Sequence, residues 1–335
     1  MNKVLFIGGP GNISRTTVED VLSRKFTTAL FTNEPNVPPE IKDKAEIIFG
    51  DRNDKGALKA VADRFKPDIV CDFVCFSPNQ AREAVEIFSD KIEQYIFIST
   101  VDVYGYPLHT IPQSENDPWV PTITQYAEDK KTCEEIFTTA DRGKFPITIA
   151  RPSYSFGKGF LLHFTSFGGI DMLKRLQRKK PVIVPGDGTT LLHASAAPNT
   201  GLMIAKMIGH YPSVGKSYTC GHHRILTQDQ YITEIASVVG EEPVIEHIPS
   251  DVILKAGGKE LQGCPITIHL RQHIAFSVDA FSRDFPDFHW PWPLKDAIKL
   301  YIDANQKELA TEMTETVDDR IIKSWHGYLE TLPVK

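Results

Sequence analysis

The sequence predicts an α/β protein with a doubly wound parallel sheet, followed by a smaller C-terminal α+β region. Over about the first 150 of its 335 residues, short unbroken apolar runs alternate with longer stretches of helical spacing. Repeated β–α units joined by right-handed crossovers give a parallel sheet that is covered by helices on both faces. After residue 157 this alternation is replaced by a looser mixture of helices and strands.

The first half begins with the apolar run KVLFIGG at residues 3–9, which predicts a buried strand. The stretch at 16–24 has helical spacing and predicts the first helix. Further apolar and amphipathic runs continue the same alternation. They predict strands at 27–32, 45–51, 67–76, 94–100 and 146–153, and helices at 55–65, 80–90 and 124–137.

The C-terminal part contains one well-marked helix at 224–240. Thr227 is placed to cap its start, Gln230 completes a capping box, and Gly240 ends it. The other elements are predicted from shorter patterns. They are helices at 165–180 and 289–306, a strand at 181–188, and a strand followed by a turn over 242–251.

Composition limits the classes of function. The net charge of −6 and the pI of about 6.0 argue against a dominant surface for nucleic acid or anionic membrane. The five cysteines are odd in number, scattered and without a CxxC pair, which predicts a reducing cytoplasm, no disulfides and no metal. No apolar run is long enough to span a bilayer. We therefore expect a cytoplasmic protein with a small-molecule substrate, and a homodimer stays open.

Three glycines, Gly8, Gly9 and Gly11, come directly after the first predicted strand and before the first predicted helix. Glycine permits a tight turn and lets a phosphate approach backbone N–H groups at a helix N-terminus. The third position of the spacing Gly8-x-x-Gly11-x-x-Ser14 is a small residue, so the helix can still pack closely on the strand. The loop predicts dinucleotide binding; the alternative is a tight turn that binds no ligand.

The end of the second predicted strand bears on the choice of cofactor. An acidic residue there binds the adenine ribose of NAD. Asn33 occupies this position, Glu34 follows it, and no arginine is adjacent to take a 2′-phosphate. The sequence therefore favours NAD, and NADP stays open because Arg15 or Arg52 can approach from elsewhere in the chain.

The predicted helix at 124–137 carries Tyr126 and Lys130, four positions apart and so on one face. A nearby positive charge favours the phenolate, so Lys130 is expected to lower the pKa of Tyr126. A tyrosine that exchanges a proton in this way is a general acid/base. The alternative is a surface pair without function.

Several motifs occur together in one order: the glycine loop, GDRND at 50–54, YIFISTVDVYG at 95–105, Tyr126-x-x-x-Lys130, ARPSYSFG at 150–157 and VIVPGDGT at 182–189. In this order they resemble the extended short-chain dehydrogenase/reductase superfamily, the NAD-dependent epimerase/dehydratase group. The resemblance is clear over about residues 3–255. It implies a Rossmann domain formed by 1–157 and about 189–222, and a substrate-binding region formed by about 158–188 and 223–335.

The resemblance also implies roles for individual residues. Thr100 holds the substrate oxygen, Tyr126 transfers the proton, Lys130 holds the nicotinamide ribose, and Asp102 is a further candidate catalytic residue. Asp51 matches the acid that bonds the adenine amino group. The implied cofactor-binding residues are Gly8, Gly11, Asn12, Ile13, Asn33, Asp51, Arg52, Val74, Cys75, Phe76, Ser99, Tyr126, Lys130, Pro152, Ser153 and Tyr154.

Two departures from the family pattern bear on the reaction. Dehydratase members carry Thr-Asp-Glu where this chain reads Thr100-Val101-Asp102, so net oxidoreduction or epimerisation fits better than dehydration. The stretch that often supplies a diphosphate-binding arginine here carries Leu192 and His193. The expected function is an NAD(P)-dependent oxidoreductase or epimerase acting on a sugar, a nucleotide sugar or another polyhydroxylated or cyclic metabolite. The alternatives are an RNA-binding or a dinucleotide-sensing, non-catalytic member of the same fold.

Overall fold

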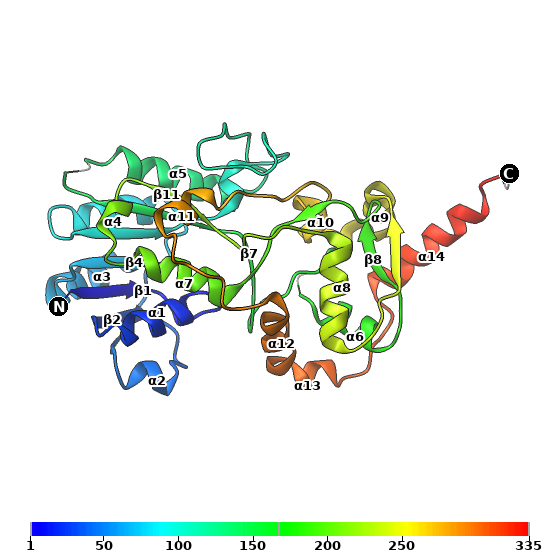
Figure 1. Ribbon diagram of the computed structural model, residues 1–335, viewed down its shortest axis with the longest axis horizontal. Coiled ribbons are helices and arrows are strands. Elements are labelled where there is room, and N and C mark those ends of the chain that lie inside the picture. Colours follow the sequence, from blue (N-terminus) through cyan, green and yellow to red (C-terminus); the bar gives the residue numbers. More distant parts are fainter. Residues whose placement is uncertain (1, 142, 167, 334–335) are drawn as a thin grey trace.

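The computed structural model describes residues 2–141, 143–166 and 168–333. Its main sheet has seven strands in the order β11-β6-β5-β4-β1-β2-β3, and every neighbouring pair is parallel (Figure 1). The predicted doubly wound α/β fold is thus confirmed. The strands are β1 (Lys3–Ile7), β2 (Thr27–Thr32), β3 (Glu46–Phe49), β4 (Ile69–Asp72), β5 (Gln94–Ile98), β6 (Ile147–Pro152) and β11 (Ser217–Cys220).

The strand order reverses between β1 and β4, which pair with Ile7 opposite Asp72. From β1 the chain builds outwards to β2 and β3, then returns to β4 and builds in the other direction. At such a switch point the loops leaving the two central strands diverge, which opens a crevice at their carboxyl ends. Topology alone therefore places a ligand site beside residue 8 and residue 73.

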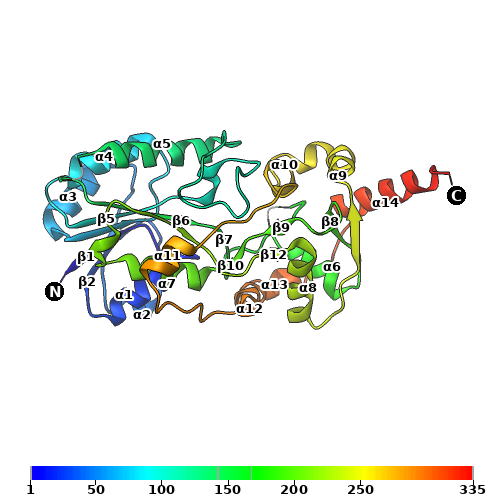
Figure 2. The ribbon, with the colours of Figure 1, turned by 45° about the horizontal axis from the view of Figure 1, so that its top comes forward.

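Helices cover both faces of this sheet, and each face has its own apolar core (Figure 2). The sheet is buried on both faces, which explains why its strands read as continuous apolar runs rather than as alternating patterns. One face carries α3 (Lys55–Phe65), α4 (Pro78–Phe88) and α5 (Gln125–Thr139), and the other carries α1 (Ser14–Ser23), α7 (Ala197–Met207) and α11 (Asp279–Asp284). A short helix α2 (Pro39–Lys42) follows β2, and a 3-10 turn η1 (Val101–Tyr104) follows β5.

The rest of the chain forms a second body of structure beside the carboxyl ends of the strands (Figure 1). Three small sheets pair β7 (Tyr154–Phe156) with β10 (Ala194–Ala196), β8 (Val182–Pro185) with β13 (Ile245–Ile248), and β9 (Leu191–Leu192) with β12 (Leu226–Thr227). The helices there are α6 (Ile170–Gln177), α8 (Gln228–Val239), α9 (Ser250–Gly257), α10 (Pro265–Ile268), α12 (Leu294–Ala304), α13 (Gln306–Leu309) and α14 (Val317–Glu330), with a 3-10 turn η3 (Gly258–Leu261). A further 3-10 turn, η2 (Tyr211–Ser213), joins α7 to β11 and packs on the main sheet.

Two elements of the second body, α6 and α9, differ from the sequence predictions. Helix α6 starts only at Ile170, because the preceding Gly168 and Gly169 favour a loop over the early part of the predicted helix at 165–180. The turn predicted after β13 is instead the start of α9, whose first residue Ser250 follows Pro249. Within the described residues, no helix is long and apolar enough to cross a membrane.

Candidate active site

A long groove runs across the carboxyl ends of β1 and β4. It consists of two adjoining pockets of about 510 and 520 Å³. Both pockets are lined by Gly9, Gly11, Val74 and Phe76, so the glycine loop forms the saddle between them. We call the pocket that contains Asp51 the adenosine end and the pocket that contains Tyr126 the reaction end.

The glycine loop has the shape that a bound pyrophosphate needs. Gly8 has φ +84°, and a Cβ built on it would lie 2.6 Å from a methyl carbon of Val74, so only glycine fits there. A Cβ built on Gly11 would meet no neighbouring atom nearer than the Ser14 hydroxyl, at 3.5 Å. The space above Gly11 is therefore free for a ligand rather than filled by protein. Together with the paired pockets, this cradle fits an extended dinucleotide such as NAD.

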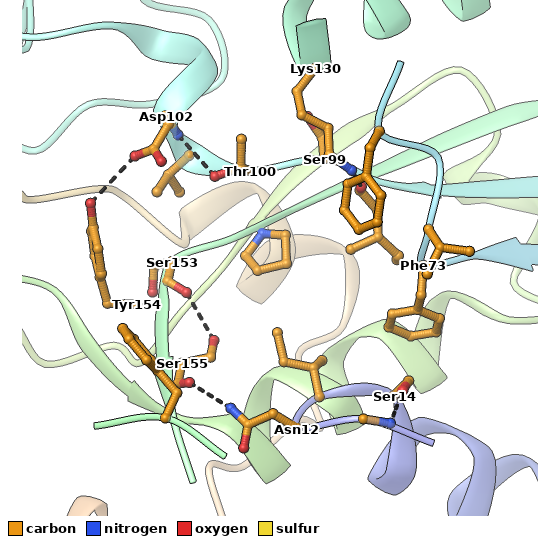
Figure 3. Close-up of a pocket in the computed structure, with 18 of the residues that line it drawn as sticks. Asn12, Ser14, Phe73, Ser99, Thr100, Asp102, Lys130, Ser153, Tyr154 and Ser155 are labelled. Atoms are coloured by element: carbon orange, nitrogen blue, oxygen red, sulfur yellow. Dashed lines mark hydrogen bonds between the residues drawn. The ribbon is translucent and has the colours of Figure 1, made fainter. Parts of the chain in front are cut away.

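Asn12 ties this loop to the far wall of the reaction end. Its side-chain amide donates to the carbonyl of Ser155 at 2.9 Å, and its oxygen accepts from the Gly159 amide at 3.3 Å. Ser14 caps the loop from within, because its hydroxyl accepts from the Gly11 amide at 2.7 Å. Figure 3 shows Asn12, Ser14 and Ser155 on the same side of the pocket.

The adenosine end brings together Asn33 and Glu34 from the loop after β2 with Asp51 and Arg52 from the loop after β3. Arg52 is buried, and its Nε lies 3.2 Å from a carboxylate oxygen of Asp72. That pairing places the guanidinium at the base of the pocket. Arg15, by contrast, is paired with Glu19 and Glu40 on the surface, and it does not line this pocket.

The reaction end brings Thr100, Asp102, Tyr126 and Lys130 into one pocket, together with most of the cofactor-binding residues predicted around them. Thr100 follows β5 directly, and its hydroxyl accepts from the Asp102 amide at 3.2 Å, as Figure 3 shows. Predicted residues Asn12, Ile13, Ser99, Pro152, Ser153 and Tyr154 also line this pocket.

Helix α5 places Tyr126 and Lys130 one turn apart, as predicted. Thr124 fixes the start of this helix, because its hydroxyl accepts from the Ala127 amide at 3.1 Å. Lys130 is 1% exposed, and its Nζ donates to the carbonyls of Cys75 and Ile98 at 2.8 and 2.7 Å. An ammonium has three hydrogens, so one hydrogen remains beyond these two bonds at the ends of β4 and β5.

The pKa of Tyr126 departs from the expectation. Burial of its hydroxyl and the charge of Asp102 raise the pKa to about 12, and only the Thr100 side chain lowers it. The residue as a whole is 45% exposed, so the ring meets solvent while the hydroxyl points into the pocket. The expected lowering by Lys130 is wrong for this state of the protein, because Nζ lies 5.9 Å from the ring centre and is bonded to backbone carbonyls.

Cys75 is the one predicted cofactor residue whose side chain takes no part in the groove. It is fully buried in the core beneath α4 and α5, whereas its neighbours Val74 and Phe76 line both pockets. All three residues follow the end of β4 at Asp72, where the chain turns towards α4. Only its backbone carbonyl reaches the site, through Lys130.

No arginine lines the reaction end among the described residues. His193, in the stretch where relatives often carry one, is buried, and its Nε2 faces the carbonyl of His222. Burial lowers the pKa of His193 to about 4, so it carries no charge near neutral pH. Arg175 is also buried and pairs with Asp319, far along the chain. Among the described residues, this pocket therefore has no arginine to bind a diphosphate.

The neighbouring histidines His222 and His223 stack on each other, with ring centres 4.3 Å apart. Trp290 packs against both rings. The described residues contain no cluster of three or more His, Cys, Asp or Glu side chains able to hold a metal ion.

Sequence reasoning missed several residues of the reaction end. Phe73 and Phe160 add apolar walls, and Ser155 adds a carbonyl. Tyr106 and His269 lie behind Asp102 and Tyr154. Tyr106 lies only four residues after Asp102, so the sequence could have suggested it. His269 is far along the chain in a stretch without a motif.

A doubly wound sheet with a dinucleotide-sized groove at its switch point defines a class of nucleotide-dependent enzymes. The model of the NAD dependent epimerase/dehydratase family matches residues 4–195. This chain therefore belongs to that family, and it is an NAD-dependent enzyme of the short-chain dehydrogenase/reductase type. A search of curated proteins found no match.

Solved structures agree in fold. A putative epimerase from Burkholderia cenocepacia is 16% identical with a TM-score of 0.72, over 91% of this chain and 98% of that one. A dTDP-glucose 4,6-dehydratase from Bacillus anthracis, in complex with NAD, is 16% identical with a TM-score of 0.69, over 92% and 97%. A Thermus thermophilus UDP-glucose 4-epimerase, also in complex with NAD, is 17% identical with a TM-score of 0.68, over 91% and 99%.

Proposed function

We propose that this enzyme moves a hydride between NAD and a carbon that bears a hydroxyl or a ketone in a sugar, nucleotide sugar or other polyhydroxylated or cyclic metabolite, with Tyr126 as acid/base. The observation that carries the proposal is the meeting of Thr100, Tyr126 and Lys130 at one end of a groove whose other end fits adenosine. Similarity to the sugar-nucleotide enzymes above supports the substrate class. Residues 158–188 and 223–335 are the proposed substrate-binding region.

The proposed work of each side chain follows from its surroundings. NAD, when bound in the groove, would supply the hydride-transfer chemistry. Tyr126 takes the hydroxyl proton of the substrate as the carbon loses its hydride, and Thr100 donates a hydrogen bond to the same oxygen. Lys130 keeps its buried charge close to the Tyr126 ring, and its remaining hydrogen is available to the nicotinamide ribose. Gly8 and Gly11 leave room for the pyrophosphate.

Epimerisation through a transient ketone and net oxidoreduction use the same side chains. The missing arginine at the reaction end favours a substrate without a tightly held diphosphate. All five cysteines are free and buried, which supports the proposed reducing cytoplasmic setting.

One experiment tests the proposal in two stages. Purified protein is denatured, and released small molecules are identified by mass spectrometry, while NADH binding to untreated protein is followed by nicotinamide fluorescence. A panel of sugars, sugar nucleotides and cyclitols is then incubated with protein and NAD, and both NADH formation and epimer formation are measured. Binding of NADH with turnover that depends on Tyr126 supports the proposal; RNA binding or NADH binding without any turnover contradicts it.

A further inference from the structure

A group of three polar rings lies behind the substrate side of the reaction end. Asp102 lines the pocket, and its Oδ1 accepts from the Tyr106 hydroxyl at 3.0 Å. The Tyr154 hydroxyl lies 3.4 Å from the same oxygen and also contacts Nε2 of His269. Figure 3 shows Tyr154 reaching towards Asp102 along the wall of the pocket.

His269 is held firmly in this group. It is 7% exposed, its ring stacks on Tyr106 with centres 5.5 Å apart, and its Nδ1 has no hydrogen-bond partner among the described residues. The titratable groups that contact it are Tyr106 and Tyr154, and Asp102 acts on it through space. Burying an imidazole nitrogen without a hydrogen bond costs free energy, so its presence here calls for an explanation.

The single hydrogen of the Tyr154 hydroxyl limits how these groups can bond to one another. The phenol has one hydrogen but two polar neighbours, Asp102 and His269. If the hydrogen points to ionised Asp102, then Nε2–H of His269 donates to the phenol oxygen. If it points to Nε2, the 3.4 Å contact with Oδ1 holds a hydrogen bond only when Asp102 carries a proton. With a hydrogen on Nδ1 in both cases, the two arrangements contain the same number of protons and differ in which end of the group holds one of them.

We propose that Asp102, Tyr154 and His269 form a second proton-transfer chain in the reaction end, separate from Tyr126, in which His269 acts through Tyr154 on the charge of Asp102. A proton that reaches Asp102 from the pocket is passed on in one concerted shift. The Asp102 O–H bond breaks as a bond forms to the Tyr154 oxygen, and the Tyr154 hydrogen moves to Nε2 of a ring that carries its own hydrogen on Nδ1. Asp102 is then ionised again and His269 is the cation.

This proposal rests on the proposed function for its use in catalysis, but the chain itself does not depend on the cofactor. Burial lowers the pKa of His269 below its ordinary value, and the charge of Asp102 opposes part of that shift. Burial and Asp102 both raise the pKa of Tyr154, so its phenol stays protonated and can relay a proton without becoming an anion. Tyr106 and His269 are positioning residues, since neither lines the pocket itself.

The test uses the full-length protein without cofactor or substrate. The His269 ring proton is assigned in the NMR spectrum by its loss in His269→Gln, and its titration is followed in wild type, Asp102→Asn and Tyr154→Phe. Loss of the Asp102 charge should move the His269 midpoint to lower pH by roughly half a unit or more, and Tyr154→Phe should also move it. The exposed His247, bonded to Asp229, supplies the control variant His247→Gln, which should leave the midpoint unchanged. If the His269 midpoint is unchanged in both Asp102→Asn and Tyr154→Phe, the proposed proton-transfer chain is wrong.

A kinetic measurement tests the use of the chain. On a substrate found by the panel, His269→Gln should bind NADH as wild type does, yet lose at least about tenfold in kcat and lose the limb of the pH–rate profile that His269 controls. A profile with the wild-type shape overturns the proposed role even if the fold is stable. Failure of wild-type protein to bind NADH would instead sink the proposed function, and the NMR titration would still decide on the chain.

Discussion

The two ends of the groove serve one cofactor with different chemistry. The adenosine end is polar and open, with Asn33, Asp51 and Asn53 exposed, and the buried Arg52 beneath them is neutralised by Asp72. The reaction end instead buries Lys130 and keeps the hydroxyl of Tyr126 out of water. Binding at the first end depends on shape and backbone, whereas reactivity at the second depends on how burial and neighbouring charges set proton affinity.

A substitution in the glycine loop, where the two ends of the groove meet, should give the largest effect. Gly11→Val adds a side chain over the space where both pockets meet, while its Cβ meets no protein atom closer than 3.5 Å. The fold should survive, and NADH affinity should fall at least about a hundredfold, on the order of 3 kcal/mol. Fluorescence titration measures the loss. Gly327→Val is the matched control, since nothing lies within 4 Å of its Cβ. Wild-type affinity in a folded Gly11→Val protein would show that the cofactor does not cross this loop.

At the reaction end, Tyr126→Phe removes the acid/base but keeps the ring. NADH affinity should stay close to wild type, and kcat should fall at least about a hundredfold, the low end for loss of a general acid/base. Steady-state rates on the substrate from the panel measure this. Tyr328→Phe, on the exposed part of α14, controls for loss of any phenol. Full activity in Tyr126→Phe would make the Tyr126–Lys130 pair a surface feature.

Lys130→Met should affect both binding and rate, because one side chain serves the helix, the strand ends and the proposed ribose contact. Loss of the ribose bond should weaken NADH binding by about tenfold, or 1.4 kcal/mol. The carbonyls of Cys75 and Ile98 would lose their donor, which should lower the free energy of unfolding by about 1–3 kcal/mol. Denaturant unfolding and fluorescence titration measure the two effects. An equally stable variant would mean that water replaces Nζ at both carbonyls.

The adenosine end should discriminate between cofactors more modestly. Glu34 lines the pocket, and its carboxylate accepts from the Asn36 amide at 2.9 Å, which fixes a negative charge near the ribose. NADH should bind more tightly than NADPH by about 1 kcal/mol or more, roughly fivefold. Calorimetry with both cofactors measures the ratio, and Glu34→Gln should narrow it. Tighter binding of NADPH would place Arg52, which also lines this pocket, on a 2′-phosphate.

The sequence predicted the sheet better than the region beside it, for physical reasons. Strands β1 and β5 are buried on both faces and read as unbroken apolar runs. Strand β11 was missed because its four residues, Ser217–Cys220, include three hydroxyl side chains. The two- and three-residue strands β7, β9, β10 and β12 are too short to show any periodicity.

The same contrast holds within the site. The position of Gly8, Gly11, Tyr126 and Lys130 along the groove could be predicted, because each pair has a short fixed spacing in the sequence. The contact between Tyr154 and His269 joins residues 115 positions apart, and no local pattern records such a contact. The raised pKa of Tyr126 was also missed, because it depends on burial and then on the charge of Asp102, which lies in η1. Neither can be known before the chain is folded.

The smallest expected effect tests that influence of Asp102 on Tyr126. In the oxidative direction Tyr126 must act as a phenolate, so the rate should rise with pH through the pKa of its phenol. Burial and Asp102 raise that pKa to about 12 in the free protein, and the positive nicotinamide ring of the oxidised cofactor should lower it in the complex. Asp102→Asn removes one raising influence, so the midpoint of the pH–rate profile should move to lower pH by roughly half a unit, about 0.7 kcal/mol. The absolute rate falls as well if Asp102 exchanges protons with the substrate, but the midpoint of the high-pH limb reports on Tyr126, because the pKa of His269 is lowered. A midpoint that stays in place or rises would show that the charge of Asp102 does not reach the phenol once the cofactor is bound.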